Sequence, residues 1–349
     1  MEKQRDLRLD VIRSLALFFT VGMHFMDNSG LYVVDITGPW PVATAMLRML
    51  MASCVPMFLM LSGWLCGRRT LSRRHYLGIV RILEVYLIAS LLCLVYRAFI
   101  AKEEGIGLRY VLSSILNFYA SGYAWYVMMY LGLFLMMPFL NLAFNSLEDR
   151  QQRLIMILSF FVLSHLPSLM NMRVQLLSVW WTRLYPITYY LTGAYLYTCR
   201  PKLSAAKAGG LLALLVPLCV LANRLIYSVH GAALVGVSYD HAEVYCISVL
   251  LFVLLLRVPA ERFPAALGRF FQWVSRLSFG AYLLSWISDG LIYPAFAVRV
   301  PGHFFRLPWA IPLTLLSTAI ALALSQLTEW LRRPLDRLVQ RALRALSLT

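Results

Sequence analysis

Two side chains in the first apolar stretch of the sequence have the types and the spacing that chemistry requires. Arg13 and His24 are eleven residues apart, which in an α-helix is about 20° beyond three full turns, so both lie on one face, roughly 16 Å apart along the axis. Asp10, Thr20 and Asp27 fall within about 60° of the same line. Histidine exchanges protons near neutral pH, and arginine stabilises anions. This face could therefore carry general acid–base chemistry on a substrate that develops negative charge.

A purely structural role for this polar face is the alternative interpretation. Asp10 and Arg13, at positions i and i+3, could form an ion pair at the membrane interface, while His24 hydrogen-bonds a neighbouring helix. However, a charge inside a membrane costs at least about 2.5 to 3.5 kcal/mol, so a polar line along a whole helix must face something polar. We interpret the complete line as functional, whereas His24 taken alone fits either role.

A basic cluster follows the second apolar stretch and consists of Arg68, Arg69, Arg73, Arg74 and, further on, Arg81. Cytoplasmic connections of membrane proteins are generally rich in Lys and Arg, so orientation alone could explain the cluster. The forked guanidinium group also matches phosphate oxygens, which makes an anion-binding site the other interpretation. Arg81 is expected inside a membrane helix, where Glu84 at i+3 could pair with it.

Three further signals are weaker. Ser62 lies in a stretch that also holds proline and glycine, which could loosen backbone hydrogen bonds beside a cavity. Trp125 and Tyr126 are typical of an aromatic belt at the outer face of the bilayer, with stacking on a sugar ring as the other interpretation. Glu329 beside Arg332 predicts an interfacial ion pair. The His and Cys residues lack metal-ligand spacing, so we predict no metal site.

The composition indicates that helices in a lipid bilayer position these residues. Of the 349 residues 60% are hydrophobic and 14% charged, with a mean hydropathy of +0.70, whereas a soluble domain carries about 25% charged residues. This excludes most soluble enzymes. We predict an all-α, polytopic membrane protein that forms a single domain over residues 1–349, with about ten helices long enough to cross roughly 30 Å of hydrocarbon. The predicted helices cover residues 9–26, 43–66, 78–100, 125–144, 154–172, 179–198, 209–229, 242–256, 274–297 and 307–331.

The distribution of basic residues predicts the orientation of these helices. A net charge of +16 could indicate either a nucleic-acid partner or basic membrane loops. The Lys and Arg residues concentrate in alternate connections, beginning with the N-terminal piece, and this is the pattern of cytoplasmic connections. We therefore predict that both termini are cytoplasmic, that membrane lipids surround the chain, and that no nucleic acid binds.

The order of these motifs resembles the acyltransferase-3 family of integral-membrane acyltransferases. The segment from Leu9 to Arg13 followed by His24 is similar to the family's Leu-Asp-x-x-Arg opening and its Arg-x10-His signature. Further family-like pieces follow in order along almost the whole chain: Phe58 to Gly63, Arg81 to Leu83 with Tyr86, Trp125 to Pro138, Gly193, Ser278 to Leu283, and Glu329 to Leu335.

This resemblance implies an acyltransferase of the class that transfers groups other than aminoacyl groups. It implies that acetyl-CoA, or another acyl-CoA, is a cytoplasmic co-substrate rather than a permanently bound cofactor. The implied acceptor is a hydroxyl of a glycan or lipid-linked sugar, and the implied location is the bacterial cytoplasmic (inner) membrane, in a stand-alone enzyme of cell-envelope polysaccharide modification. His24 would then be catalytic, Arg13 would orient the thioester or stabilise its oxyanion, and Arg81 with the basic cluster would hold coenzyme A phosphates.

Two positions depart from the family pattern. Gly78 stands where the family often has a second arginine, three residues before Arg81, with Arg73 or Arg74 as candidate substitutes. Ser285 stands where a histidine often follows the Tyr-Leu-Ile motif, and Ser285 or Asp289 could supply its contribution.

A transporter is the alternative function. A polar helix face with intramembrane arginines also describes a path for a glycan precursor or a small anion. The sequence shows no inverted repeat of paired broken helices, which disfavours this alternative. The acceptor, the acyl group and the oligomeric state stay open at this stage.

Overall fold

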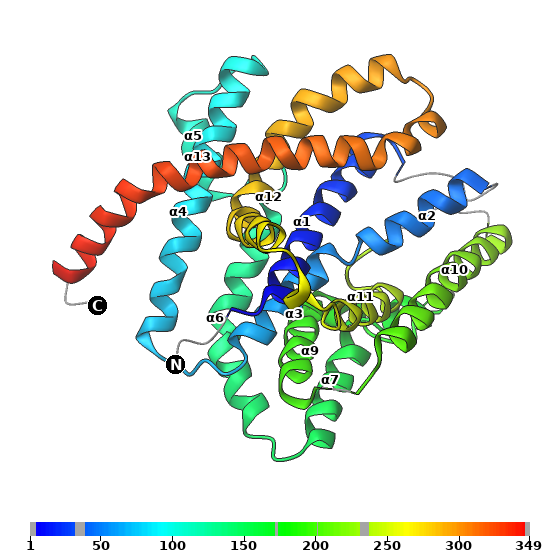
Figure 1. The fold of residues 1–349 in the computed structure, drawn as a ribbon. Coiled ribbons are helices and arrows are strands. Elements are labelled where there is room, and N and C mark those ends of the chain that lie inside the picture. The colour runs from blue at the N-terminus through cyan, green and yellow to red at the C-terminus, as the bar shows by residue number, and fades with distance from the viewer. Residues whose placement is uncertain (1–4, 32–38, 172–173, 201, 231–236, 346–349) are drawn as a thin grey trace.

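The described part of the chain consists of helices joined by short connections. The structure is a computed structural model, and it describes residues 5–31, 39–171, 174–200, 202–230 and 237–345. Every regular element within these ranges is helical (Figure 1), which confirms the all-α prediction. The α-helices are α1 (Leu7–Asn28), α2 (Pro39–Met51), α3 (Cys54–Cys66), α4 (Arg73–Val95), α5 (Leu108–Leu116), α6 (Trp125–Asn145), α7 (Arg150–Ser164), α8 (Pro167–Met170), α9 (Tyr185–Cys199), α10 (Ala205–His230), α11 (Ala242–Leu255), α12 (Ala265–Arg299) and α13 (Ala310–Ala345).

Seven helical segments in the described residues are long and apolar enough to cross a membrane. They are Leu7–Asn28, Trp40–Cys66, Arg73–Ile100, Trp125–Asn145, Ala205–Leu225, Ala265–Arg299 and Phe305–Arg337. The remaining three of the ten predicted helices correspond to α7, α9 and α11, which have 15, 15 and 14 residues. At 1.5 Å per residue these three helices are shorter than roughly 30 Å of hydrocarbon. A multi-pass membrane protein is thus established, while ten crossings stay a prediction.

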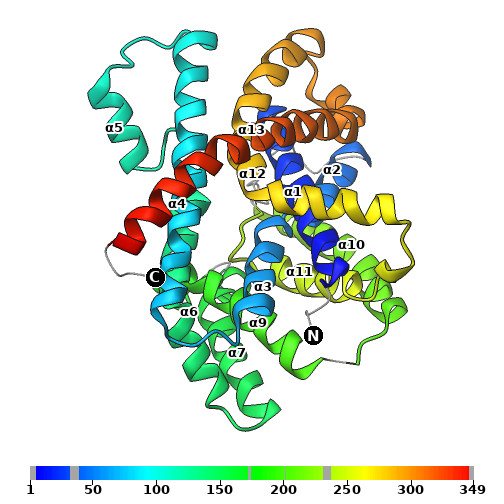
Figure 2. The ribbon, with the colours of Figure 1, turned by 60° about the vertical axis from the view of Figure 1, so that its left-hand side comes forward.

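The helices α7 and α9 run in opposite directions, as their contacts show, and the contacts of α11 place its two ends. Arg150 at the start of α7 bonds Tyr195 near the end of α9, and Ser164 at the end of α7 bonds Thr188 near the start of α9. The amide of Ala242 at the start of α11 donates to Ser168 of α8, and the carbonyl of Leu256 after the end of α11 accepts a bond from Arg8 at the start of α1. Figure 2 shows α5 at one end of the molecule and the α6–α7 turn at the other.

Helix α1 lies inside the bundle, packed against α12, α3 and α13 (Figures 1 and 2). Its side chains Ile12, Leu17 and Phe25 are fully buried, so its apolar faces contact protein. Asp6 caps the helix by accepting a hydrogen bond from the Arg8 amide, and its hydrogen bond with the Arg8 side chain lowers the pKa of the Asp6 carboxyl. The polar face of α1 consequently lies in the interior of the protein.

The closest helix contact joins α3 to α9 and depends on two glycines. A Cβ atom on Gly63 would lie 1.8 Å from the carbonyl oxygen of Tyr190, and one on Gly193 would lie 2.0 Å from that of Met60. Both obstacles are backbone atoms, which cannot rotate away as a side chain can. Small residues permit such close backbone approach between membrane helices. This contact fixes the position of α3 beside α1.

We therefore expect Gly63→Ala to destabilise the protein by at least about 1–3 kcal/mol, the usual cost of overpacking. The matched control is Gly132→Ala in α6, where an added Cβ would meet nothing within 4 Å. Unfolding in detergent micelles can be followed with a thiol-reactive fluorophore, because Cys54 and Cys93 are buried. Equal midpoints for the two variants would contradict the close packing.

Candidate functional site

His24 projects from the last turns of α1 toward α12 and contacts two side chains there. Its Nδ1 atom lies 3.2 Å from Ser285 Oγ and 3.4 Å from Asp289 Oδ2. The Ser285 hydroxyl already donates its proton to the carbonyl oxygen of Tyr282, so Ser285 is placed to accept from Nδ1–H. Both partners therefore favour the tautomer with the proton on Nδ1, which leaves Nε2 with a free lone pair. A histidine held this way can act as a general base.

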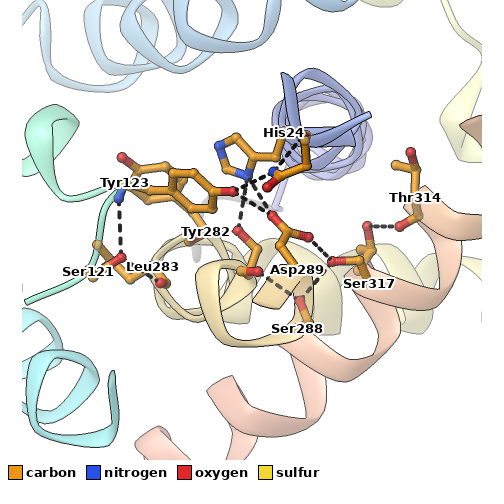
Figure 3. Close-up of polar contacts among 12 residues, drawn as sticks. His24, Ser121, Tyr123, Tyr282, Leu283, Ser288, Asp289, Thr314 and Ser317 are labelled. Carbon is orange, nitrogen blue, oxygen red and sulfur yellow. Dashed lines mark hydrogen bonds and ion pairs between the residues drawn. The ribbon is translucent and has the colours of Figure 1, made fainter. Parts of the chain in front are cut away.

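Asp289 is only 2% exposed, and its carboxylate is held from two further elements. The Tyr123 hydroxyl donates to Oδ2 at 2.8 Å, and Ser317 Oγ of α13 donates to Oδ1 at 2.6 Å. Ser288 lies 2.7 Å from the same Ser317 hydroxyl. Figure 3 shows these side chains converging beside α1. A buried carboxylate requires such hydrogen bonds, and here they fix the group that orients His24.

Tyr123 covers one face of His24. The two rings are stacked with centroids 3.5 Å apart and planes 16° apart. Tyr123 belongs to the connection between α5 and α6, which Ser121 anchors by donating to the carbonyl oxygen of Leu283. Asn28, one turn after His24, donates to the Tyr123 hydroxyl at 3.2 Å. The imidazole thus has a fixed position as well as a fixed tautomer.

A cavity of about 410 Å³ extends along the part of α1 that precedes His24 in the chain. It brings five predicted site residues together: Arg13, Ser62, Arg81, Tyr126 and Glu329. It lies between α1, α3, α4, α6, α12 and α13. Arg276 is a third guanidinium in its lining, and Arg13 donates to Ser275 Oγ at 3.3 Å. Thr20 and Tyr282 also line it, and the Tyr282 ring centroid lies 6.4 Å from that of His24. The cavity therefore extends from the arginines to Tyr282, and His24 lies behind Tyr282 without lining either this cavity or the second one described below.

A second cavity, of about 670 Å³, shares the lining residue Arg13 with the first. Four more arginines line it: Arg5, Arg8, Arg68 and Arg200. Arg68 also lies over the ring of Tyr197, with its guanidinium carbon 4.8 Å from the centroid. Asp10 lines this cavity as well and is held by two hydrogen bonds from Arg5, at 2.8 and 2.6 Å. The surplus of guanidinium groups suits an anionic ligand.

Several sequence-based pairings and placements are wrong. Asp10 pairs with Arg5 rather than with Arg13, because the chain before α1 folds back over the start of the helix. Glu84 lies 3.5 Å from Arg332 of α13 rather than pairing with Arg81, since α4 turns this face toward α13. Tyr126 is buried and stacked on Tyr130 inside the first cavity instead of forming part of a lipid-facing belt.

Other predicted residues lie outside the two cavities. Arg69, Arg73 and Arg74 line neither of them. Asp27 is exposed at the end of α1. Trp125 is 38% exposed and stacks on Tyr239.

The expected ion pair between Glu329 and Arg332 is present, at 3.2 Å, and Ser62 bonds Tyr130 within the first cavity.

The two departures from the family pattern have structural explanations. At Gly78 a Cβ would lie 3.3 Å from the Phe134 ring, so a longer side chain there requires the ring to move. Arg276 from α12 contributes a guanidinium group to the cavity instead. Ser285 contacts His24 directly, together with Asp289.

Sequence reasoning missed Tyr123, and it named Asp289 only as a possible substitute for the family's histidine, without its contact to His24. Asp289 carried a usable signal, because it is a carboxylate inside the predicted helix 274–297. Tyr123 carried none, since it lies in a connection whose path only the fold determines.

The fold and the site define a polytopic helical membrane protein with a buried, carboxylate-oriented histidine beside an arginine-lined cavity. A family model described as "Acyltransferase domain" matches residues 6–326, nearly the whole chain. The chain belongs to this acyltransferase-3 family. No curated protein and no solved structure matches it.

The buried pair of Glu84 and Arg332 generates a stability prediction. Both Glu84 oxygens are buried without a hydrogen bond among the described residues, so Arg332 supplies their compensation. Arg332→Met leaves this carboxylate next to Glu329 without its cationic partner. We therefore expect the free energy of unfolding to fall by about 3–5 kcal/mol. The double variant Glu84→Leu/Arg332→Met should recover most of this lost stability. Thermal unfolding of both variants is the measurement. A double variant as unstable as Arg332→Met would show that the pair does not determine stability.

Proposed function

We propose that the chain is a membrane O-acyltransferase, most specifically an O-acetyltransferase, that moves an acyl group from cytoplasmic acyl-CoA to a hydroxyl of a glycan or lipid-linked sugar. Membership of the acyltransferase family supports the reaction class. The observation that carries the proposal is the position of His24, held by Ser285 and Asp289 near the far end of a cavity that begins at arginines. The proposed setting is the bacterial inner membrane, in modification of cell-envelope polysaccharide.

We place the acyl-CoA donor in the two cavities. Coenzyme A carries phosphates at one end and the thioester at the end of a long pantetheine arm, so its two ends need different surroundings. The arginines of the second cavity, with Arg13 at the junction, suit the phosphates. From Arg13 the first cavity follows α1 to Thr20, about 10 Å farther along the axis, and His24 lies one further turn beyond. Arg13 and Arg81 thus act on the donor, at a distance from the reacting carbonyl.

The acyl transfer needs one group that accepts the hydroxyl proton, and we assign this role to His24. The acceptor hydroxyl oxygen attacks the thioester carbonyl carbon while Nε2 of His24 takes the hydroxyl proton. Collapse of the tetrahedral intermediate breaks the carbon–sulfur bond, and His24 returns the proton to the departing thiolate. Asp289 keeps the imidazole in the required tautomer and stabilises its protonated form between the two steps. The products are an ester and free coenzyme A.

His24→Ala and Asp289→Asn test this assignment. We expect His24→Ala to lower transfer by about 10²–10⁴-fold, the usual contribution of a general base, and Asp289→Asn to lower it less, because Nε2 remains. The measurement is incorporation of base-labile label from [¹⁴C]acetyl-CoA into the glycans of bacterial membranes that hold the protein. The matched control is Asp336→Asn, an acidic residue that is 42% exposed near the end of α13. Undiminished transfer by a folded His24→Ala protein would remove His24 from catalysis.

Donor binding can be tested without an acceptor. Coenzyme A at a hundred times its dissociation constant should stabilise the folded protein by about 2.7 kcal/mol, and Arg13→Gln or Arg200→Gln should weaken this effect. Arg109→Gln, on the exposed surface of α5, is the control. The measurement is the unfolding midpoint with and without coenzyme A. No response to coenzyme A, together with a response to a small anion such as inorganic phosphate, would favour a transporter instead.

A further inference from the structure

The Tyr282 hydroxyl is a buried hydrogen-bond donor without an acceptor. Tyr282 is 6% exposed and lines the first cavity, and its hydroxyl has no hydrogen-bond partner among the described residues. Leaving a buried hydroxyl unpaired costs about 1–3 kcal/mol. The neighbouring Ser285 and Ser288 hydroxyls of the same helix both have partners. An unpaired donor at this position therefore indicates a ligand that accepts from it.

The surroundings of this hydroxyl define the kind of acceptor. The Tyr282 ring lies 6.4 Å from the His24 ring, centroid to centroid, and packs edge-on against Tyr126 at 5.7 Å. The Tyr282 hydroxyl is therefore a buried donor at the end of the cavity nearest the general base.

We propose that Tyr282 is a catalytic residue whose hydroxyl donates to the thioester carbonyl oxygen and to the oxyanion that forms from it. This inference rests on the proposed acyl-CoA function and names the group that stabilises its charged intermediate. Arg13 cannot take this role, because it lies roughly 16 Å from His24 along α1. When the acceptor oxygen bonds to the carbonyl carbon, the carbonyl π electrons move to the carbonyl oxygen, and the Tyr282 hydroxyl stabilises that charge. These electrons return to form the carbonyl double bond again as the carbon–sulfur bond breaks and the thiolate leaves.

Tyr282→Phe removes the hydroxyl and keeps the ring. We expect the kcat for acetyl-CoA cleavage, with water or glycan as acceptor, to fall on the order of 10²–10³-fold, as for loss of one oxyanion donor. The KM for acetyl-CoA should change little. The control is Tyr245→Phe, which removes a partly buried tyrosine hydroxyl bonded to Thr192, outside both cavities. A raised KM with unchanged kcat would overturn the proposal by limiting Tyr282 to donor binding.

A spectroscopic measurement separates this proposal from the function on which it rests. Isotope-edited infrared spectra of bound acetyl-CoA with a ¹³C carbonyl report the hydrogen bonds of the thioester oxygen directly. The carbonyl stretch should lie at lower frequency in the wild type, Tyr245→Phe and His24→Ala proteins than in Tyr282→Phe. Bound acetyl-CoA with the same frequency in Tyr282→Phe as in the wild type would overturn the role of Tyr282 but leave the proposed donor standing. Absence of a bound thioester in the wild type would overturn both.

Discussion

A carboxylate buried among membrane helices must have its charge compensated, and Asp289 meets this requirement with groups from three directions. Tyr123 and Ser317 donate to its two oxygens, and the imidazole of His24 faces Oδ2. Each partner comes from a different part of the chain, so α1, α13 and the α5–α6 connection must all be in place for the carboxylate to be satisfied. The same contacts that stabilise the buried charge also orient the histidine. Removal of any one element would therefore affect both the fold and the site.

The second organising feature is the parallel pairing of α1 and α12. Arg13 contacts Ser275, and His24 contacts Ser285, so steps of eleven and ten residues along the two helices keep them in register. Both helices run from the arginine-lined end toward the histidine. A parallel pair requires an even number of reversals of direction between the two helices, and the alternating directions of α7, α9, α10 and α11 supply them. If α7, α9 and α11 did not reverse the chain, α12 would run antiparallel to α1.

How much of this the sequence could reveal depends on the range of each interaction. The face shared by Arg13 and His24 follows from helical geometry alone, and the structure turns that face inward. The alternation of basic connections predicts the orientation of the helices in the membrane, and that orientation stays a prediction. By contrast, the expected pairs of Asp10 with Arg13 and of Glu84 with Arg81 were local, whereas the observed partners depend on how the chain folds back and how helices pack. The contributions of Arg276 and Tyr123 to the site likewise depend on how the helices and connections pack.

The spacing between the arginines and His24 was the main difficulty for a mechanism based on the sequence, because both residues cannot touch one carbonyl group. The first cavity removes this conflict. It joins the two levels of α1, with guanidinium groups at one end and the tyrosine hydroxyl at the other. A donor whose phosphates stay with the arginines would have to span this distance with its pantetheine arm, and its acyl group would enter the protein farther than its nucleotide. In that arrangement the acyl group would lie closer to His24 than the nucleotide does, so Arg13 and His24 would contact different parts of one donor molecule.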